Sequence, residues 1–197
     1  MGCGRSASKS ASKGLSVNSE KKANTLEAKV VLLGDSGVGK SSIAMRYVNN
    51  TFSEAFEVTI GGGYLQQVIR LKDNISLKLD IWDTGGQERF RALLQLYYRE
   101  ADAALICYDV TSDKSMDSCE YWVNELKSRE EHCLLCLVGN KIDMPQGERR
   151  VENKKAEAFA AAHGMLWLET SAKTGQNVDK LFERLANDIV RKKLIVV

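Results

Sequence analysis

The sequence has few histidines and prolines and no long apolar run. No stretch approaches the ~18 consecutive apolar residues of a transmembrane helix, and no apolar signal-peptide core stands at the start. We therefore expect no membrane-spanning segment. The two histidines, His132 and His163, have no partners that the sequence suggests, and we assign them no chemistry. The single proline, Pro145, marks a loop.

Disulfide bonds and a cysteine metal site are also disfavoured. The five cysteines are an odd number, and three of them lie in apolar runs, which favours free thiols in a reducing compartment. Cys133 and Cys136 have the spacing of a metal or redox pair. No second pair accompanies them, and the run from Cys133 to Val138 predicts a buried strand. We interpret both as core residues.

Charge is distributed unevenly along the chain. The net charge is +2, but residues 1–26 carry five basic residues against Glu20, a balance of +4, so residues 27–197 sum to −2. The body therefore offers no basic patch for nucleic acid. Residues 1–26 are rich in Ser and Lys and have almost no large apolar side chains, which predicts a disordered tail. We expect one folded domain at 27–193 and a short C-terminal end at 194–197.

Within the predicted domain, strand-like and helix-like patterns alternate. Several strands are continuous apolar runs, as in a parallel sheet covered on both faces. The pattern predicts a doubly wound α/β fold: a mostly parallel six-stranded sheet with one antiparallel edge strand and helices on both faces. The expected strands are 29–33, 64–71, 75–83, 103–109, 134–139 and 166–169, and the expected helices are 40–49, 115–129, 153–163 and 178–193.

A phosphate-binding loop follows the first predicted strand. It has the pattern G-x-x-x-x-G-K-[ST], and its residues are Gly34, Asp35, Ser36, Gly37, Val38, Gly39, Lys40 and Ser41, with Ser42 opening the next helix. Glycines let backbone N–H groups turn inward around phosphates, and the helix start adds its positive dipole end. Lys40 would reach the β- and γ-phosphates and the Ser41 hydroxyl would bind Mg²⁺. The alternative is a glycine-rich turn with a chance lysine.

The exit of the third strand carries a second candidate motif, Asp83-Thr84-Gly85-Gly86-Gln87. An aspartate at the end of an apolar strand in a phosphate-loop protein is placed to hold the Mg²⁺ shell, which is the role we assign to Asp83. Gly86 would let the backbone approach a terminal phosphate, and Gln87 would orient an attacking water. Taken alone, the motif is only a turn.

Two further strand exits indicate which nucleotide base the site binds. Asn140, Lys141 and Asp143 follow the fifth strand, and Ser171, Ala172 and Lys173 follow the sixth. A carboxylate such as that of Asp143 can accept two hydrogen bonds from guanine N1–H and the 2-amino group, which adenine cannot supply. Lys141 would lay its stem along the base, Asn140 would tie this loop to the phosphate loop, and Ala172 N–H would meet guanine O6. The four exits together predict a GTP/GDP site with Mg²⁺.

These motifs resemble the Ras superfamily of small GTPases over residues 28–192, and the stretch Trp82 to Arg99 resembles its Rab branch, with the early-endosomal subgroup closest. The resemblance implies the small G-protein fold and slow hydrolysis of GTP to GDP, with Lys40, Thr59 and Gln87 as catalytic residues. It implies that Thr59 binds Mg²⁺ and closes over the γ-phosphate, and that Phe52 packs on the guanine edge. It further implies an aromatic effector patch of Tyr64, Trp82 and Tyr97, whose alternative is ordinary hairpin packing. The implied partners of this monomer are an exchange factor, a GAP and effectors.

Two departures from the Rab pattern matter. Gly85 stands where most Rab proteins have alanine, and Gly62 and Gly63 replace bulkier residues after Thr59. A GTP-binding scaffold with little hydrolysis is therefore an alternative. Asn140 and Asp143 argue against a second alternative, a phosphate-loop kinase or ATPase.

Membrane attachment is the other departure. Rab proteins are typically prenylated on C-terminal cysteines, whereas residues 192–197 of this sequence contain none. The start, Met1-Gly2-Cys3-Gly4-Arg5-Ser6, matches the pattern for myristoylation of Gly2, with Cys3 available for palmitoylation. We expect an acylated N-terminus on the cytoplasmic face of the endosomal or plasma membrane; the alternative is a tail that merely begins Met-Gly.

Overall fold

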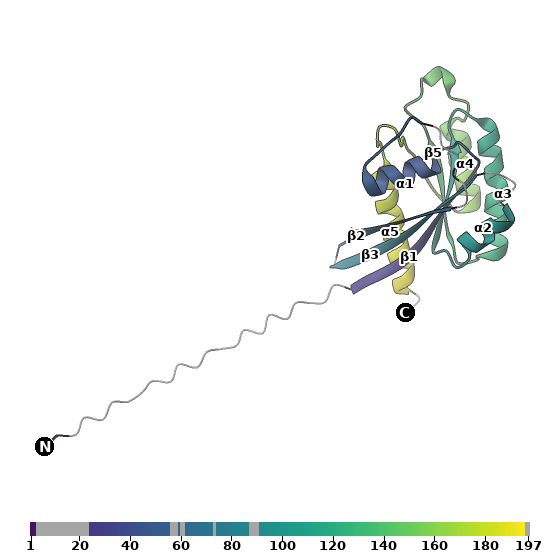
Figure 1. Cartoon of the computed structure of the whole chain (residues 1–197). Helices are drawn as coiled ribbons and strands as arrows, with labels where there is room; N and C mark the ends of the chain where they lie inside the picture. The colour runs from purple at the N-terminus through teal and green to yellow at the C-terminus, as the bar shows by residue number, and fades with distance from the viewer. Residues whose placement is uncertain (3–23, 56–58, 60–61, 73, 87–90, 196–197) are drawn as a thin grey trace.

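The computed structural model describes residues 1–2, 24–55, 59, 62–72, 74–86 and 91–195. Its centre is a six-stranded sheet with the order β2-β3-β1-β4-β5-β6 (Figure 1). Every neighbouring pair is parallel except β2 and β3, which are antiparallel. The predicted sheet, with one antiparallel edge strand, is confirmed. The strands are β1 (Asn24–Leu33), β2 (Gly62–Arg70), β3 (Ile75–Thr84), β4 (Ala103–Asp109), β5 (Leu134–Asn140) and β6 (Leu166–Glu169).

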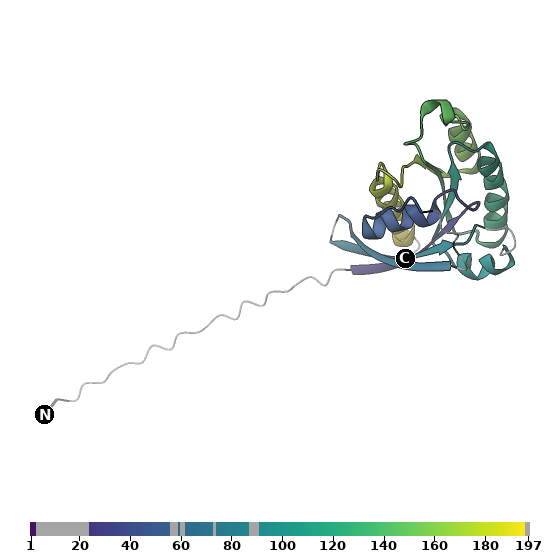
Figure 2. The same ribbon diagram turned by 45° about the horizontal axis from the view of Figure 1, so that its top comes forward.

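Helices cover both faces of the sheet (Figures 1 and 2). On one face, α1 and α5 share a core cluster with the inward side chains of β1 and β3, among them Val30 and Leu79. On the other face, α3 and α4 share a cluster with Val31 and Ile106, and Tyr98 of α2 joins it. The helices are α1 (Lys40–Asn49), α2 (Arg91–Tyr98), α3 (Asp113–Arg129), α4 (Asn153–His163) and α5 (Val178–Ile195), with a 3-10 turn at Gln146–Glu148. Among the described residues, no helix combines the length and apolarity needed to cross a membrane.

Several element boundaries differ from the prediction. β1 begins at Asn24, inside the segment assigned to the tail, because its first residues pair with β3 from Ile75 onward and Leu26 packs against the core. α5 continues to Ile195, inside the segment assigned to the C-terminal end. α3 begins at Asp113, where the Ser112 side chain caps it by accepting a hydrogen bond from Ser115 N–H.

The sequence analysis also missed α2. This helix has only eight residues and begins at Arg91, shortly after the predicted motif at Gly86 and Gln87 in the sequence. A helix this short has little stability of its own, so its periodicity is a weak signal and burial against the sheet, here through Tyr98, decides whether it forms.

The parallel strands bring the predicted motifs to one edge of the sheet. The phosphate loop follows β1, Asp83 lies near the end of β3, Asn140 ends β5, and Ser171 lies just beyond β6. Parallel strands present their carboxyl ends on the same side, and ligands of open α/β sheets bind there.

Candidate functional site

A cavity of about 270 Å³ opens at this edge of the sheet. Its walls come from the phosphate loop, the segment after α1, and the loops after β3, β5 and β6. The predicted residues that line it are Ser36, Gly37, Gly39, Lys40, Ser41, Ser42, Phe52, Thr59, Gly86, Asn140, Lys141, Asp143, Ala172 and Lys173. Five other predicted residues do not line it: Gly34, Asp35, Val38, Asp83 and Ser171. Gln87 and Cys3 lie outside the described residues.

The glycines of the phosphate loop are required by close backbone contacts. Gly34 has φ of +136°, and a Cβ built on it would lie 2.3 Å from the carbonyl oxygen of Cys107 in β4. Gly39 has φ of +97°, and its Cβ would lie 2.2 Å from Asn140 Nδ2. A side chain at either position would strain the backbone and push the loop away from β4 or β5. The loop therefore keeps this path only with glycine at both positions.

Lys40 is held inside the loop. Its side chain is buried, and Nζ donates to the carbonyl oxygens of Gly34 and Asp35 at 2.9 and 2.8 Å. Burial lowers the pKa of Lys40, which the nearby Cys107, Asp83 and Asp35 oppose. An ammonium has three N–H donors, so within the described part of the chain one is left for a phosphate oxygen.

The three predicted Mg²⁺ residues lie together. Ser41 Oγ and Thr59 Oγ1 are 2.8 Å apart, although the residues come from different segments. Asp83 is buried, and its Oδ1 has no hydrogen-bond partner among the described residues. Burial raises the pKa of Asp83 above its ordinary value, opposed by a hydrogen bond from Ser41 and by the charge of Lys40. An oxygen-only donor set with an unsatisfied buried carboxylate fits a hard divalent cation such as Mg²⁺.

Gly86 lies directly against the phosphate loop. A Cβ at this position would be 2.4 Å from the backbone nitrogen of Ser36 and 2.5 Å from the carbonyl carbon of Asp35. Thr84, two residues earlier, donates its hydroxyl to the carbonyl oxygen of Leu32 at 2.6 Å, which anchors the segment to β1. The segment that leads to Gln87 therefore begins in contact with the loop that would hold the phosphates.

Asn140 joins three segments of the site. Its Nδ2 donates to the carbonyl oxygen of Val38 at 2.9 Å, which confirms the predicted tie to the phosphate loop. Its Oδ1 accepts from the backbone N–H of Ala172 at 3.1 Å and lies 3.4 Å from the Thr170 hydroxyl. The Ala172 N–H that we assigned to guanine O6 is thus engaged by Asn140, and a bound base would share it.

The carboxylate predicted to bind guanine is oriented by a serine. Asp143 Oδ1 accepts from the Ser171 hydroxyl at 2.6 Å, and Ser171 Oγ in turn accepts from the backbone N–H of Thr174. Lys141 has a left-handed backbone with φ of +70°, and its Nζ pairs with Asp109 Oδ2 at 2.7 Å. Both side chains of this loop are therefore positioned by protein contacts before any base binds.

Sequence reasoning missed Arg46, which fixes the loop after β6. Its guanidinium donates to the carbonyl oxygens of Ala172 and Lys173 at 2.8 and 2.7 Å, reaching from α1 across to that loop. It also missed Glu54, whose carboxylate pairs with Lys173 Nζ at 2.8 Å at the cavity, and the lining residues Ser53, Ala55 and Met144. No local motif marks these residues, because their partners lie far away in the sequence.

The three aromatic residues assigned to an effector patch are in contact. The ring centroids of Tyr64 and Trp82 are 5.2 Å apart, and those of Trp82 and Tyr97 are 5.8 Å apart. Tyr64 is half exposed, and its hydroxyl donates to Asp80 Oδ1 at 2.6 Å. The space that a side chain at Gly62 would need is taken by the Tyr97 ring, 2.6 Å from the Cβ position. This arrangement fits both ordinary hairpin packing and a patch for effectors.

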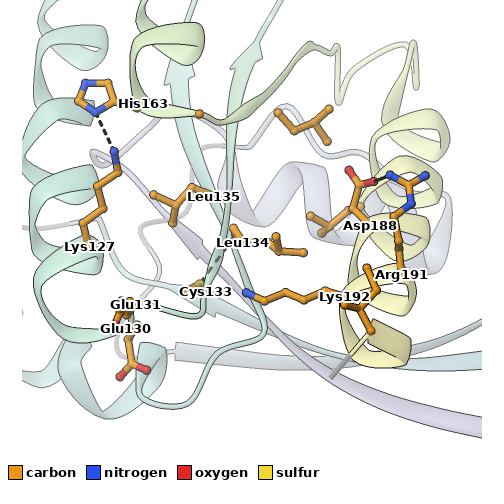
Figure 3. A pocket seen from close by; sticks show the side chains of 14 residues that line it. Lys127, Glu130, Glu131, Cys133, Leu134, Leu135, His163, Asp188, Arg191 and Lys192 are labelled. Atoms are coloured by element: carbon orange, nitrogen blue, oxygen red, sulfur yellow. Dashed lines mark hydrogen bonds and ion pairs between the residues drawn. The ribbon is translucent and has the colours of Figure 1, made fainter. Parts of the chain in front are cut away.

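A second cavity, of about 550 Å³, lies at the opposite, amino-terminal end of β5 and β6 (Figure 3). Its basic groups have protein partners: Lys127 Nζ lies 3.3 Å from His163 Nδ1, Arg191 pairs with Asp188, and Lys192 donates to the carbonyl oxygen of His132. The cavity is larger than the first one, but the described residues that line it include no glycine-rich loop and no cation without a protein partner to hold phosphates. We therefore place the nucleotide in the smaller cavity.

The fold and the cavity together define a phosphate-loop protein of the guanine-nucleotide-binding class. Comparison with known proteins agrees: residues 29–191 match the model of the Ras family. The chain belongs to the Ras family.

Its relatives place it among the Rab-type small GTPases. It is 45% identical to "GTP-binding protein ypt5" of Schizosaccharomyces pombe, over 84% of this chain and 79% of that protein. It is 46% identical to "Ras-related protein Rab-5B" of Plasmodium falciparum, over 86% and 81% of the two chains. It is 43% identical to "Ras-related protein Rab-5A" of Dictyostelium discoideum, over 82% of this chain and 80% of that protein. The predicted class, a GTPase similar to the Rab5 group, is confirmed.

Proposed function

We propose that this protein is a GTP/GDP switch that acts in endosomal membrane traffic, recruits effectors in its GTP state and ends the signal by hydrolysis. The observation that carries the proposal is the single cavity in which Lys40, the Ser41–Thr59 pair and Asp143 meet. Thr59 is the key member, because it joins a segment outside the phosphate loop to a residue that would bind the metal. Similarity to Rab5 proteins supports the endosomal assignment.

The chain's own groups position the nucleotide and neutralise its charge. Two N–H groups of the Lys40 ammonium donate to carbonyl oxygens of the loop, and the third N–H donates to a phosphate oxygen. Ser41, Thr59 and Asp83 would hold Mg²⁺, and the ion would supply charge neutralisation at the phosphates. Gln87 orients the attacking water. No arginine finger is evident in the sequence, so the intrinsic rate is expected to be on the order of 10⁻⁴ s⁻¹ and to rise when a GAP supplies the missing charge.

Gln87→Leu is expected to lock the protein in its GTP state. Loss of the group that orients water should slow hydrolysis by about 10²-fold or more, while guanine binding stays unchanged. Single-turnover hydrolysis of GTP and the nucleotide content of the purified protein measure both quantities. Gln146→Leu, in the exposed 3-10 turn, is the matched control. If the wild-type protein binds GTP but scarcely hydrolyses it even with a GAP, the scaffold alternative is favoured; unchanged GAP-stimulated turnover in Gln87→Leu contradicts the role of Gln87.

The switch acts at a membrane through its N-terminus. Myristate on Gly2 gives marginal binding by itself, and palmitate on Cys3 or the basic tail residues would make it stable. Exchange factor, GAP and effectors bind through the segments that carry Thr59 and Gln87 and through the aromatic patch of Tyr64, Trp82 and Tyr97. The protein works as a monomer on the cytoplasmic face of the endosomal or plasma membrane.

Gly2→Ala is expected to move the protein from membranes to the cytosol, since acylation requires the amine of an N-terminal glycine. Fractionation of cells that express a C-terminally tagged chain measures the change. Gly4→Ala keeps Gly2 and should stay on membranes. Membrane retention of Gly2→Ala would show that another part of the protein anchors it.

A further inference from the structure

Asp35, the second residue of the phosphate loop, carries a negative charge beside a site for negatively charged phosphates. Its backbone carbonyl accepts a hydrogen bond from Lys40, so the residue belongs to the loop's framework. Its carboxylate, however, does not line the nucleotide cavity. Asp35 lines a separate cavity of about 580 Å³ between the phosphate loop and α3. The side chain is therefore directed away from the phosphates.

Ser118 of α3 holds it there. The Ser118 hydroxyl donates to Asp35 Oδ2 at 2.7 Å, a contact between residues 83 positions apart in the sequence. The same hydroxyl lies 3.1 Å from the carbonyl oxygen of Lys114, its neighbour one turn earlier in α3. A hydroxyl has one proton, and the shorter, charge-assisted bond to the carboxylate is the stronger of the two.

α3 is a rigid support for this contact. Cys119, next to Ser118, is fully buried, and the helix packs on the sheet through Met116, Trp122 and Val123. A hydrogen bond from such a helix fixes a flexible loop better than a bond within the loop would. Because Gly86 also packs on the backbone of Asp35, the same bond steadies the start of the segment that carries Gln87.

We infer that Ser118 is a positioning residue of the nucleotide site: its hydrogen bond from α3 keeps the Asp35 carboxylate out of the phosphate cradle. Without the hydroxyl, the carboxylate loses the side-chain donor that α3 supplies and can turn toward the phosphates, which it repels. The nucleotide then dissociates faster. The inference rests on the proposed binding of GDP and GTP in the cavity beside the loop.

The test is the dissociation rate of a fluorescent GDP analogue from the full-length protein, chased with excess GDP in Mg²⁺. Ser118→Ala is expected to release it about 5- to 20-fold faster, the scale of losing one hydrogen bond to a charged group at a half-buried site. Ser118→Thr keeps a hydroxyl and should stay within about twofold of wild type. Ser128→Ala is the matched control, since Ser128 lies on the same helix and its hydroxyl donates to the carbonyl oxygen of Glu125 in that helix.

A second variant distinguishes repulsion by the Asp35 charge from a general loosening of the fold as the cause of faster release. In the Ser118→Ala background, Asp35→Asn removes the repelling charge and should return the rate to within about twofold of wild type. Wild-type release from Ser118→Ala, or equally fast release from the double variant, would overturn the inference. Failure of the proposed function gives a different result in the wild-type protein. The protein would then bind no GDP analogue, or excess ATP would displace the bound analogue as well as excess GTP does.

Discussion

Asp143→Ala is expected to weaken GDP binding by about 10²- to 10⁴-fold. A carboxylate acceptor contributes about 1.5–3 kcal/mol to each of the two hydrogen bonds that guanine N1–H and the 2-amino group would make with it. The Ser171 hydroxyl, 2.6 Å from Asp143 Oδ1, already orients the acceptor, so little reorganisation opposes binding. Equilibrium titration with a fluorescent GDP analogue measures the loss.

Asp143→Asn makes the same test more specific. An amide donates where the carboxylate accepted, so it opposes the 2-amino group of guanine but suits the 2-oxygen of xanthine. Binding should therefore shift from GDP to xanthosine diphosphate. Asp117→Ala, which removes an exposed carboxylate of α3 that pairs with Lys155 of α4, serves as the control and should bind GDP normally. Undiminished GDP binding by Asp143→Ala would mean that the base lies elsewhere.

Gly86→Ala is expected to slow GTP hydrolysis by about 10²-fold, the cost of misplacing reacting groups by about 1 Å. The added Cβ would lie 2.4 Å from Ser36 N and 2.5 Å from the Asp35 carbonyl carbon. These are backbone atoms that cannot turn aside, so the segment after β3 must move away from the phosphate loop and carry Gln87 with it. GDP affinity should change much less, because Asn140, Asp143 and Lys40 are untouched.

Single-turnover hydrolysis and GDP titration of the same Gly86→Ala preparation separate the two effects. The control is Gly147→Ala, since a Cβ at Gly147 meets nothing within 4 Å. Hydrolysis at the wild-type rate in Gly86→Ala would show that the segment does not need its contact with the loop.

The aromatic patch shows that the residues of a surface can be named from the sequence while the contacts that assemble it cannot. Tyr64, Trp82 and Tyr97 do form one contiguous cluster. The register of β2 against β3 puts Tyr64 opposite Trp82, and α2 brings Tyr97 to them. Since α2 itself escaped prediction, the sequence supplied the three residues but not the short helix that completes the cluster.

The sequence by itself determined which residues stand at each strand exit and the chemistry that we propose for them: the phosphate loop at Gly34–Ser41, the carboxylate of Asp83 and the proposed base-binding residues Asn140 and Asp143. Each motif lies within one short segment, and its spacing follows from what a strand, a turn and a helix start require locally. The alternation of strands and helices likewise predicted the order of layers, since continuous apolar strands must be covered on both faces.

Only the tertiary structure decided how these motifs support one another. Arg46 reaches Ala172 and Ser118 reaches Asp35, each across a long separation in the sequence. Such contacts depend on the strand order, the register and the way α1 and α3 pack on opposite faces. A hydroxyl or guanidinium on a helix surface carries no local signal of its distant partner, so the residues that hold the site together became visible only once the chain was folded.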